Sequence, residues 1–391
     1  MRGTIKKRYK DSWSLVIDIG RRKDPETGKL KRHQKWFTVK GTKRAAEQKL
    51  AQIISELSTG GFVEPTKLTF ERWINDWLET NIRPTKRLRT YETYRNVINK
   101  HLNPVFGAHL LQHLTALDIQ RYYANSNLSV TTLQQHHAVL NRALGDAAKQ
   151  DLIKRNPAAL VSEKPRRTSR NEAPMLNCWD SDEAKRFLEV AAEMGSQSIA
   201  FYTLALETGM RKGELCGLKW KNVDQESKEI RVAEQLVKIG RTPLFGPPKN
   251  GRSRTIKISD RATRLLTLHK ASQAELILAN RLHYHERGLV FSKNGQNMKR
   301  HYGVLGDPLP MTSLGQVEFD PMIRRAGVSR ITFHGLRHTC ATLLLKAGTP
   351  VHVVAERLGH QNVTVTLEIY AHALPSMQRE AADQISSLIG G

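Results

Sequence analysis

The chain has 391 residues, with 62 Lys and Arg against 37 Asp and Glu, which gives a formal net charge of +25 at pH 7. Hydrophobic residues make up 39% and charged residues 25%, so folded cores are expected and a disordered polycation is excluded. No apolar run reaches the roughly 18 residues of a membrane span, and the N-terminus lacks a signal peptide's apolar stretch. Three scattered cysteines argue against a disulfide framework or a cysteine zinc site. We therefore expect a cytoplasmic protein with no membrane contact and nucleic acid as its first candidate partner.

The first 60 residues carry the densest positive charge, with 16 Lys and Arg against 6 Asp and Glu. Large apolar residues recur at every second position over 13–19 and return over 36–39, which predicts strands with one buried face. Turn signals at 24–28 separate the two runs. From Thr42 the apolar spacing becomes helical, until Gly60-Gly61 ends it. We predict a small sheet packed on one helix, with its outward cations contacting DNA; the alternative is a merely solvated basic surface.

The second region, 65–162, has a helical pattern. Apolar side chains fall at i, i+3, i+4, i+7 and i+8 from Phe70 to Leu78, and similar stripes cover 91–102 and 129–148. We interpret their aromatic members as core rather than as base-stacking platforms. The loop 83–89 and the linker 163–173 combine cations with prolines and are well placed to meet DNA phosphates.

The third region begins with two isolated cations in turn-forming contexts. Glycines on both sides of Arg211 permit a tight helix-to-helix turn that holds the guanidinium in a fixed place. Two strand-like runs, 230–237 and 254–258, flank an Asn-Gly turn, so we predict a hairpin with Lys249 at its tip. Each signal alone is weak, because such residues are common on surfaces.

Further basic side chains lie on a predicted helix after Thr332. His334 and Arg337 are three residues apart and therefore share one helical face. His334 and His338 are four apart, which also suggests a zinc pair. However, Gly335 stands where the HExxH pattern needs its glutamate, and no third ligand accompanies the pair. We therefore predict no metal site.

The last candidates are His360, which follows Leu358-Gly359, and Tyr370 at a helix end. Two arginines can clamp the oxygens of a phosphodiester. Tyrosine can act as a covalent nucleophile when cations favour the phenolate and a histidine accepts the proton. A lysine can protonate the departing sugar oxygen. The set predicts metal-free transesterification through a phosphotyrosine, with no cofactor.

Five segments, in this order, resemble those of the tyrosine recombinases, the phage integrase family: TGMRKGEL (208–215), PPKNGRSR (247–254), HGLRHT (334–339), LGH (358–360) and the tyrosine of EIYAH (368–372). The resemblance implies a multidomain α+β fold. An arm-type DNA-binding domain of three strands and a helix would span 1–61, and an all-α core-binding domain 65–162. The linker 163–173 would lead to a mainly α catalytic domain with a small antiparallel sheet and a C-terminal tail, over 174–391.

The resemblance also implies a role for each candidate. Arg211 and Arg337 would hold the scissile phosphate, and Lys249 would be the general acid for the 5′-oxygen. His334 would assist proton transfer at the nucleophile. The two remaining roles fall to His360, which would hydrogen-bond the phosphate or the transition state, and to Tyr370, which would attack and leave a 3′-phosphotyrosyl bond.

Three neighbouring residues complete this assignment. Lys257 is the alternative to Lys249, although the spacing to Ser253-Arg254 favours Lys249. Glu214 is expected to orient the arginine turn, and His338 to buttress the site.

The function implied is that of a site-specific DNA recombinase, the integrase or excisionase of a phage or integrative element. Its partners would be double-stranded DNA, at core and arm attachment sites, and three further copies of the chain in a homotetramer. Accessory DNA-bending and directionality proteins are possible further partners. It would act in the bacterial cytoplasm, at the nucleoid. The apolar stripe after Pro375 is expected to dock on a neighbouring subunit; the alternative is packing on its own domain.

Two other functions use parts of the same pattern. A type IB topoisomerase would need similar catalytic residues, but the arm-like N-terminus and the tail argue against it. A DNA-binding regulator derived from an integrase would not need all six candidate residues.

Overall fold

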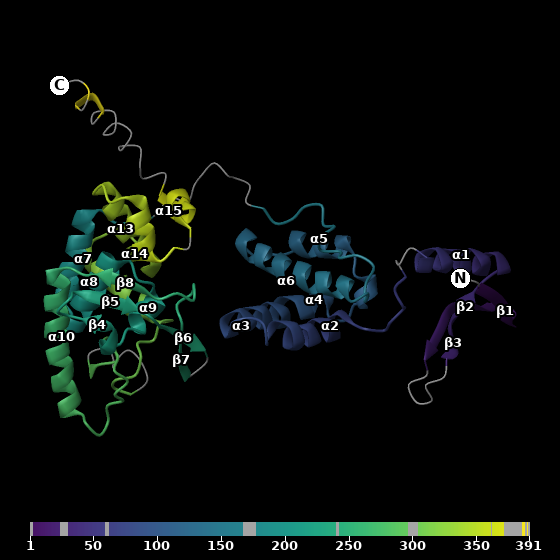
Figure 1. The fold of residues 1–391 in the computed structure, drawn as a ribbon, viewed down its shortest axis with the longest axis horizontal. Helices are drawn as coiled ribbons and strands as arrows, with labels where there is room; N and C mark the ends of the chain where they lie inside the picture. The colour runs from purple at the N-terminus through teal and green to yellow at the C-terminus, as the bar shows by residue number, and fades with distance from the viewer. Residues whose placement is uncertain are drawn as a thin grey trace. The chain divides into compact units, whose positions relative to one another are not determined.

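The computed structural model describes residues 3–23, 30–58, 62–166, 177–239, 242–295, 304–360, 362–370, 385–387 and 389 (Figure 1). The chain divides into two compact units, Met1–Asn171 and Glu172–Gly391. Within the described residues, small antiparallel sheets accompany many helices, which confirms the predicted mixed fold class. No helix in these ranges is both long and apolar enough to cross a bilayer.

The first unit begins with a three-stranded antiparallel sheet and a helix. The elements are β1 (Gly3–Tyr9), β2 (Ser12–Lys23), β3 (Leu30–Lys40) and α1 (Lys43–Ser58), with the strands in the order β1-β2-β3. Leu15 and Ile17 of β2 are fully buried against Ala46 and Ile53 of α1. The alternating residues Trp13, Leu15 and Ile17 therefore mark the face of the sheet that packs on the helix. The turn signals at 24–28 and Gly60-Gly61 lie outside the described residues.

The rest of the first unit is helical. Its elements are α2 (Phe70–Trp77), η1 (Leu78–Ile82), α3 (Leu88–Val97), η2 (Ile98–Leu102), α4 (Asn103–Phe106), η3 (Leu111–His113), α5 (Ala116–Ala124) and α6 (Val130–Lys149). Phe70, Trp73 and Trp77 are buried, so the aromatic stripe is core as interpreted. The indole N–H of Trp73 donates to the Ala143 carbonyl at 3.2 Å and that of Trp77 to Asp146 at 2.8 Å. These bonds satisfy the polar ends of two buried rings and fix α2 against α6.

The second unit contains two small sheets among helices. Its helices are α7 (Ser181–Glu193), α8 (Ser196–Thr208), α9 (Lys212–Cys216), η4 (Trp220–Asn222), α10 (Asp260–Ala279), η5 (Gly315–Phe319), α12 (Asp320–Ala326), α13 (Phe333–Lys346), α14 (Val351–Leu358) and α15 (Val363–Tyr370). Its strands are β4 (Val223–Asp224), β5 (Glu229–Val232), β6 (Gln235–Ile239), β7 (Thr242–Gly246) and β8 (Arg254–Lys257). Helix α8 is apolar on nearly all sides and is buried among α7, α10 and α13.

The two runs predicted on either side of Lys249 do pair, because Ile230, Arg231 and Val232 lie opposite Ile256, Thr255 and Arg254, but Lys249 is not at the tip of a simple hairpin. The run 230–237 divides into β5, which pairs with β8, and β6, which pairs with β7. Lys249 therefore lies on the connection from β7 to β8, between two different sheets. The Asn-Gly signal did locate a turn, because the Gly251 N–H donates to the Pro248 carbonyl at 2.8 Å and Gly251 has a φ of +73°. The sequence did not reveal the additional β6–β7 pair that lies between β5 and the turn.

Candidate active site

The turn from α8 to α9 presents Arg211. Gly209 ends α8 with a φ of +60°, and a Cβ at this position would lie 2.4 Å from a methyl of Leu358, so only glycine fits. Arg211 is the N-cap of α9, three residues before Glu214. Its backbone N–H donates to Glu214 Oε2 and its Nη1 to Glu214 Oε1, both at 2.9 Å. Glu214 therefore orients both the backbone and the guanidinium of Arg211, the role expected of it.

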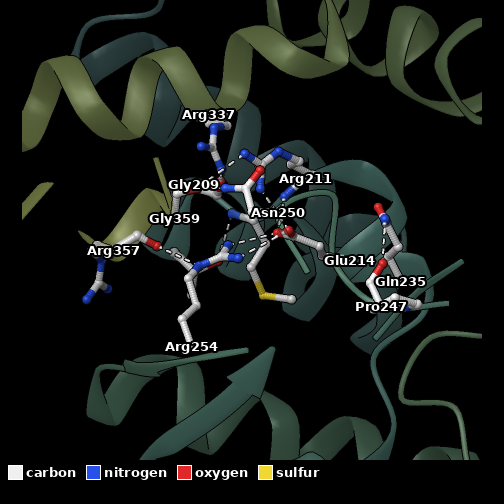
Figure 2. Close-up of polar contacts among 12 residues, drawn as sticks. Gly209, Arg211, Glu214, Gln235, Pro247, Asn250, Arg254, Arg337, Arg357 and Gly359 are labelled. Carbon is white, nitrogen blue, oxygen red and sulfur yellow. Dashed lines mark hydrogen bonds and ion pairs between the residues drawn. The ribbon is translucent and has the colours of Figure 1, made fainter. Parts of the chain in front are cut away.

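Glu214 also binds a second arginine, Arg254, at the start of β8. Arg254 Nη1 and Nη2 donate to the two carboxylate oxygens at 3.1 and 2.8 Å, and its Nε donates to the Arg357 carbonyl at 3.0 Å. We call Arg211, Glu214 and Arg254 the arginine cradle (Figure 2). Burial opposes the charge of the fully buried Glu214, but the hydrogen bonds and charges of Arg254 and Arg211 outweigh it and lower the pKa of that carboxyl. The carboxylate is therefore ionised at neutral pH.

The arginine of the HGLRHT segment reaches the same turn from α13. Thr332 caps this helix by accepting from the Gly335 N–H, and Arg337 follows one turn after Phe333. Only 3% of Arg337 is exposed, and its Nη1 donates to the Gly209 carbonyl at 2.8 Å. Figure 2 shows the guanidinium groups of Arg337 and Arg211 close to Gly209. Two helices distant in sequence thus bring both arginines to one turn.

His334 and His338 lie on the same face of α13, with ring centroids 4.8 Å apart. Although His334 is exposed by surface area, the protein packed around its ring and the charges of His338, Arg337, Arg211 and Lys249 lower its pKa to about 4. Burial and the charge of Arg337 lower the pKa of His338 as well. His334 is therefore neutral at pH 7, and it lies close enough to Arg211, Arg337 and Lys249 for their positive charges to lower its pKa. Among the described residues no three His, Cys, Asp or Glu side chains cluster as metal ligands do.

His360 follows α14, where Gly359 adopts a φ of +69° and reverses the chain. Its Nδ1 lies 2.7 Å from the hydroxyl of Thr366, which is fully buried on α15. Burial, followed by the charges of Arg337 and Arg211 and the two nearby histidines, lowers its pKa to about 4. This ring is therefore also neutral at pH 7, and α15 contributes to its orientation.

The two candidate lysines have different surroundings. Lys249 is exposed on the Pro248–Gly251 turn, and its charge acts on His334. Lys257 pairs with Glu229 at 2.7 Å and donates to the Ser227 carbonyl at 3.2 Å, which holds it along the sheet. The electrostatic influence on His334 favours Lys249 as the site lysine.

Tyr370 is the last residue of α15. It stands four residues, about one helical turn, after Thr366. Its side chain lies outside the described part of the chain. The backbone nevertheless places Tyr370 on the helix whose Thr366 hydroxyl contacts His360.

The arrangement combines three fixed guanidiniums, one exposed ammonium and three imidazoles whose lowered pKa keeps them neutral at pH 7. The guanidiniums of such a site can each bind an anion through two hydrogen bonds. The ammonium and the imidazoles beside them can donate or accept protons. The sequence did not identify Arg254, Asn250 or Thr366 as site residues. The first could have been suspected because it closes the PPKNGRSR segment, whereas nothing local distinguishes the other two.

Comparisons with known proteins identify the family of the chain. The sequence pattern of the Phage integrase family matches residues 178–377, and that of the Phage integrase, N-terminal SAM-like domain matches residues 69–126. The chain is 27% identical to a "Tyrosine recombinase XerC-like" protein of Caldanaerobacter subterraneus subsp. tengcongensis, over 98% of this chain and 97% of the relative. It is 24% identical to the "ICEBs1 integrase" of Bacillus subtilis, over 99% of this chain and 100% of the relative.

Solved structures share the fold. The Tn1549 transposon integrase in complex with a circular intermediate DNA superposes with a TM-score of 0.64 at 20% identity, covering 81% of this chain and 99% of that chain. A lambda integrase tetramer bound to a Holliday junction gives a TM-score of 0.56 at 18% identity, covering 93% of this chain and 94% of that chain.

Proposed function

The chain belongs to the phage integrase family and is a tyrosine-type site-specific recombinase, and from this premise we propose that Tyr370 is its nucleophile. The phenolic oxygen attacks the scissile phosphorus, the bond from phosphorus to the 5′-oxygen breaks, and a 3′-phosphotyrosyl ester and a free 5′-hydroxyl form. The phosphodiester energy is retained in the new ester, so a 5′-hydroxyl of another strand restores the backbone without ATP.

Arg211 and Arg337 hold the non-bridging oxygens of the phosphate. Their guanidiniums are fixed before DNA arrives, by Glu214 and by the Gly209 carbonyl. Preorganised donors need no reorganisation when negative charge builds up on the pentavalent phosphorus. The observation that carries the proposal is that both arginines reach one turn. Their positive charges also act on His334.

Proton transfers fall to the side chains around the cradle. His334, neutral at pH 7, accepts the Tyr370 proton, and a bound phosphate offsets the positive field that lowers its pKa. Lys249 donates a proton to the departing 5′-oxygen. His360, also neutral, donates a hydrogen bond from Nε2 to a phosphate oxygen.

Basic surfaces of the first unit hold the DNA. In the helical part, a hollow of about 290 Å³ is lined by residues of α3, η2 and α6, among them the cations Arg89 and Lys100 and the acidic Glu92. In the sheet, the Lys6 ammonium lies 5.6 Å from the centre of the exposed Trp36 ring. We assign core-site DNA to 65–162, arm-site DNA to 1–61 and the linking path to 163–173, with catalysis in 174–391.

The active assembly is a homotetramer on DNA in the bacterial cytoplasm, at the nucleoid, assisted by DNA-bending and directionality proteins. The tail docks on a neighbouring subunit. Among the described tail residues, Ile385 is 57% and Ile389 81% exposed, so these apolar side chains are available to a partner.

A suicide substrate made from the element's own attachment DNA tests the chemistry. Wild type should form an SDS-stable covalent adduct, and Tyr370→Phe should form none. An adduct with Tyr370→Phe would assign the nucleophile elsewhere. Relaxation of generic supercoiled plasmid would favour a topoisomerase, and specific binding without any adduct would favour a regulator.

A further inference from the structure

The turn that carries Lys249 is held at two points by side chains. Before the turn, Gln235 Nε2 donates to the Pro247 carbonyl at 2.9 Å. Within the turn, Asn250 Nδ2 donates to the Gly359 carbonyl at 2.6 Å (Figure 2). The second contact joins positions 109 residues apart and lies directly beside Lys249.

The connection needs such a contact because no strand ladder holds it. Strand β7 pairs with β6 and β8 pairs with β5, so residues between Gly246 and Arg254 belong to neither ladder. Lys249 is exposed and carries a long, flexible stem, whose ordering costs conformational entropy. The hydrogen bond from Asn250 to Gly359 fixes the backbone next to Lys249, and it therefore limits the positions that the ammonium can reach.

The acceptor is itself a fixed part of the site. Gly359 has a φ of +69°, and a Cβ there would lie 3.0 to 3.1 Å from the Arg254 side chain. Its carbonyl also faces Arg211 Nη2 at 3.5 Å, and His360 is the next residue. One carbonyl therefore adjoins the lysine turn, the arginine cradle and the His360 turn.

We propose that Asn250 is a positioning residue that holds Lys249 where its ammonium reaches the 5′-oxygen of the scissile phosphate. This inference rests on the proposed role of Lys249 as general acid. During cleavage the Tyr370 oxygen bonds to phosphorus, the bond to the 5′-oxygen breaks, and the Lys249 proton passes to that oxygen. The neutral amine takes the proton back when the strand is rejoined.

Replacing the bridging 5′-oxygen by sulfur tests the proposal, because a thiolate is a far better leaving group than an alkoxide and needs no proton. On ordinary DNA, Lys249→Ala should slow single-turnover cleavage by roughly 100-fold or more. Asn250→Ala should slow it by about 10- to 100-fold, since the lysine is present but poorly placed. On the 5′-phosphorothiolate substrate both variants should cleave within about 3-fold of wild type, because the general acid is no longer required.

Asn250→Asp provides a second variant of nearly the same size that lacks the donor, and it should behave as Asn250→Ala does. The matched control is Asn280→Ala, which removes an amide-to-carbonyl hydrogen bond of 2.9 Å at the end of α10 and should cleave both substrates at the wild-type rate. Arg211→Ala should remain slow on both substrates, because sulfur does not replace a phosphate clamp.

The outcomes separate the two claims. If sulfur rescues Lys249→Ala but not the Asn250 variants, or if those variants cleave ordinary DNA normally, the positioning role is overturned. If sulfur fails to rescue Lys249→Ala, the general-acid assignment itself is wrong.

Discussion

The arginine cradle and the Lys249 turn both bring positive charge to the candidate active site, but they hold it in opposite ways. In the cradle, a fully buried carboxylate binds two guanidiniums through bonds of 2.8 to 3.1 Å. In the turn, the ammonium is exposed, and the adjacent Asn250 amide supplies a contact to Gly359. The guanidiniums of the cradle are held by a buried carboxylate, whereas Lys249, the proposed general acid, lies on a connection that belongs to neither strand ladder. The comparison predicts that cradle variants lose both stability and activity, and that turn variants lose activity alone.

The largest effect is expected from Glu214→Gln, which keeps the side-chain size but removes the negative charge between two arginines. Removing one partner of a buried ion pair costs about 3 to 5 kcal/mol, so urea unfolding should show a loss in that range. Arg211 would also lose its orientation, and adduct formation should fall by roughly 100-fold. Full activity with normal stability would show that the cradle is not what fixes Arg211. The Asn250 variants are the contrasting case, with unchanged urea midpoints.

A smaller effect is expected at Thr366, which links the helix of Tyr370 to His360. When the Thr366 hydroxyl donates to Nδ1, the neutral ring carries its proton on Nε2, the atom proposed to donate to the phosphate. Thr366→Val keeps the shape and removes the donor, which should slow single-turnover cleavage by about 5-fold, the equivalent of about 1 kcal/mol. Thr366→Ser should restore the rate.

A His360→Phe background provides the control for this prediction. If Thr366 acts through His360, Thr366→Val should have no additional effect there. An equal loss in both backgrounds would show that Thr366 supports α15 in another way.

The last prediction concerns the pH dependence of stability rather than a rate. The pKa values of His334 and His360 are lowered to about 4, whereas in the unfolded chain histidine titrates near 6.5. Between these values the unfolded chain binds more protons, so the free energy of unfolding should be fully maintained above about pH 6.5 and should fall as the pH drops towards 4. Replacing both histidines by glutamine should make the decline between pH 7 and pH 5 shallower in urea titrations. An identical slope would show that these rings titrate normally.

The outline of the fold was predictable because its signals are local. Strand alternation over 13–19, the apolar stripe from Phe70 and the cap at Thr332 act through neighbours a few residues away. The candidate residues could be chosen because their chemistry and their order along the chain resemble one family. The turn at Lys249 was also visible, since Asn-Gly favours a turn wherever it stands.

The contacts that turn these residues into a site join positions far apart in the chain. Arg254 reaches Glu214 across 40 residues, Asn250 reaches Gly359 across 109, and Arg337 reaches Gly209 across 128. No local pattern encodes such pairs, because they depend on how α8, α13 and the two sheets pack. The β6–β7 pair before Lys249 was likewise not evident from the sequence. The sequence by itself therefore determined the charge, the elements and the chemical groups, whereas the tertiary structure decided which arginines a buried carboxylate holds and that Lys249 lies on a connection anchored through Asn250.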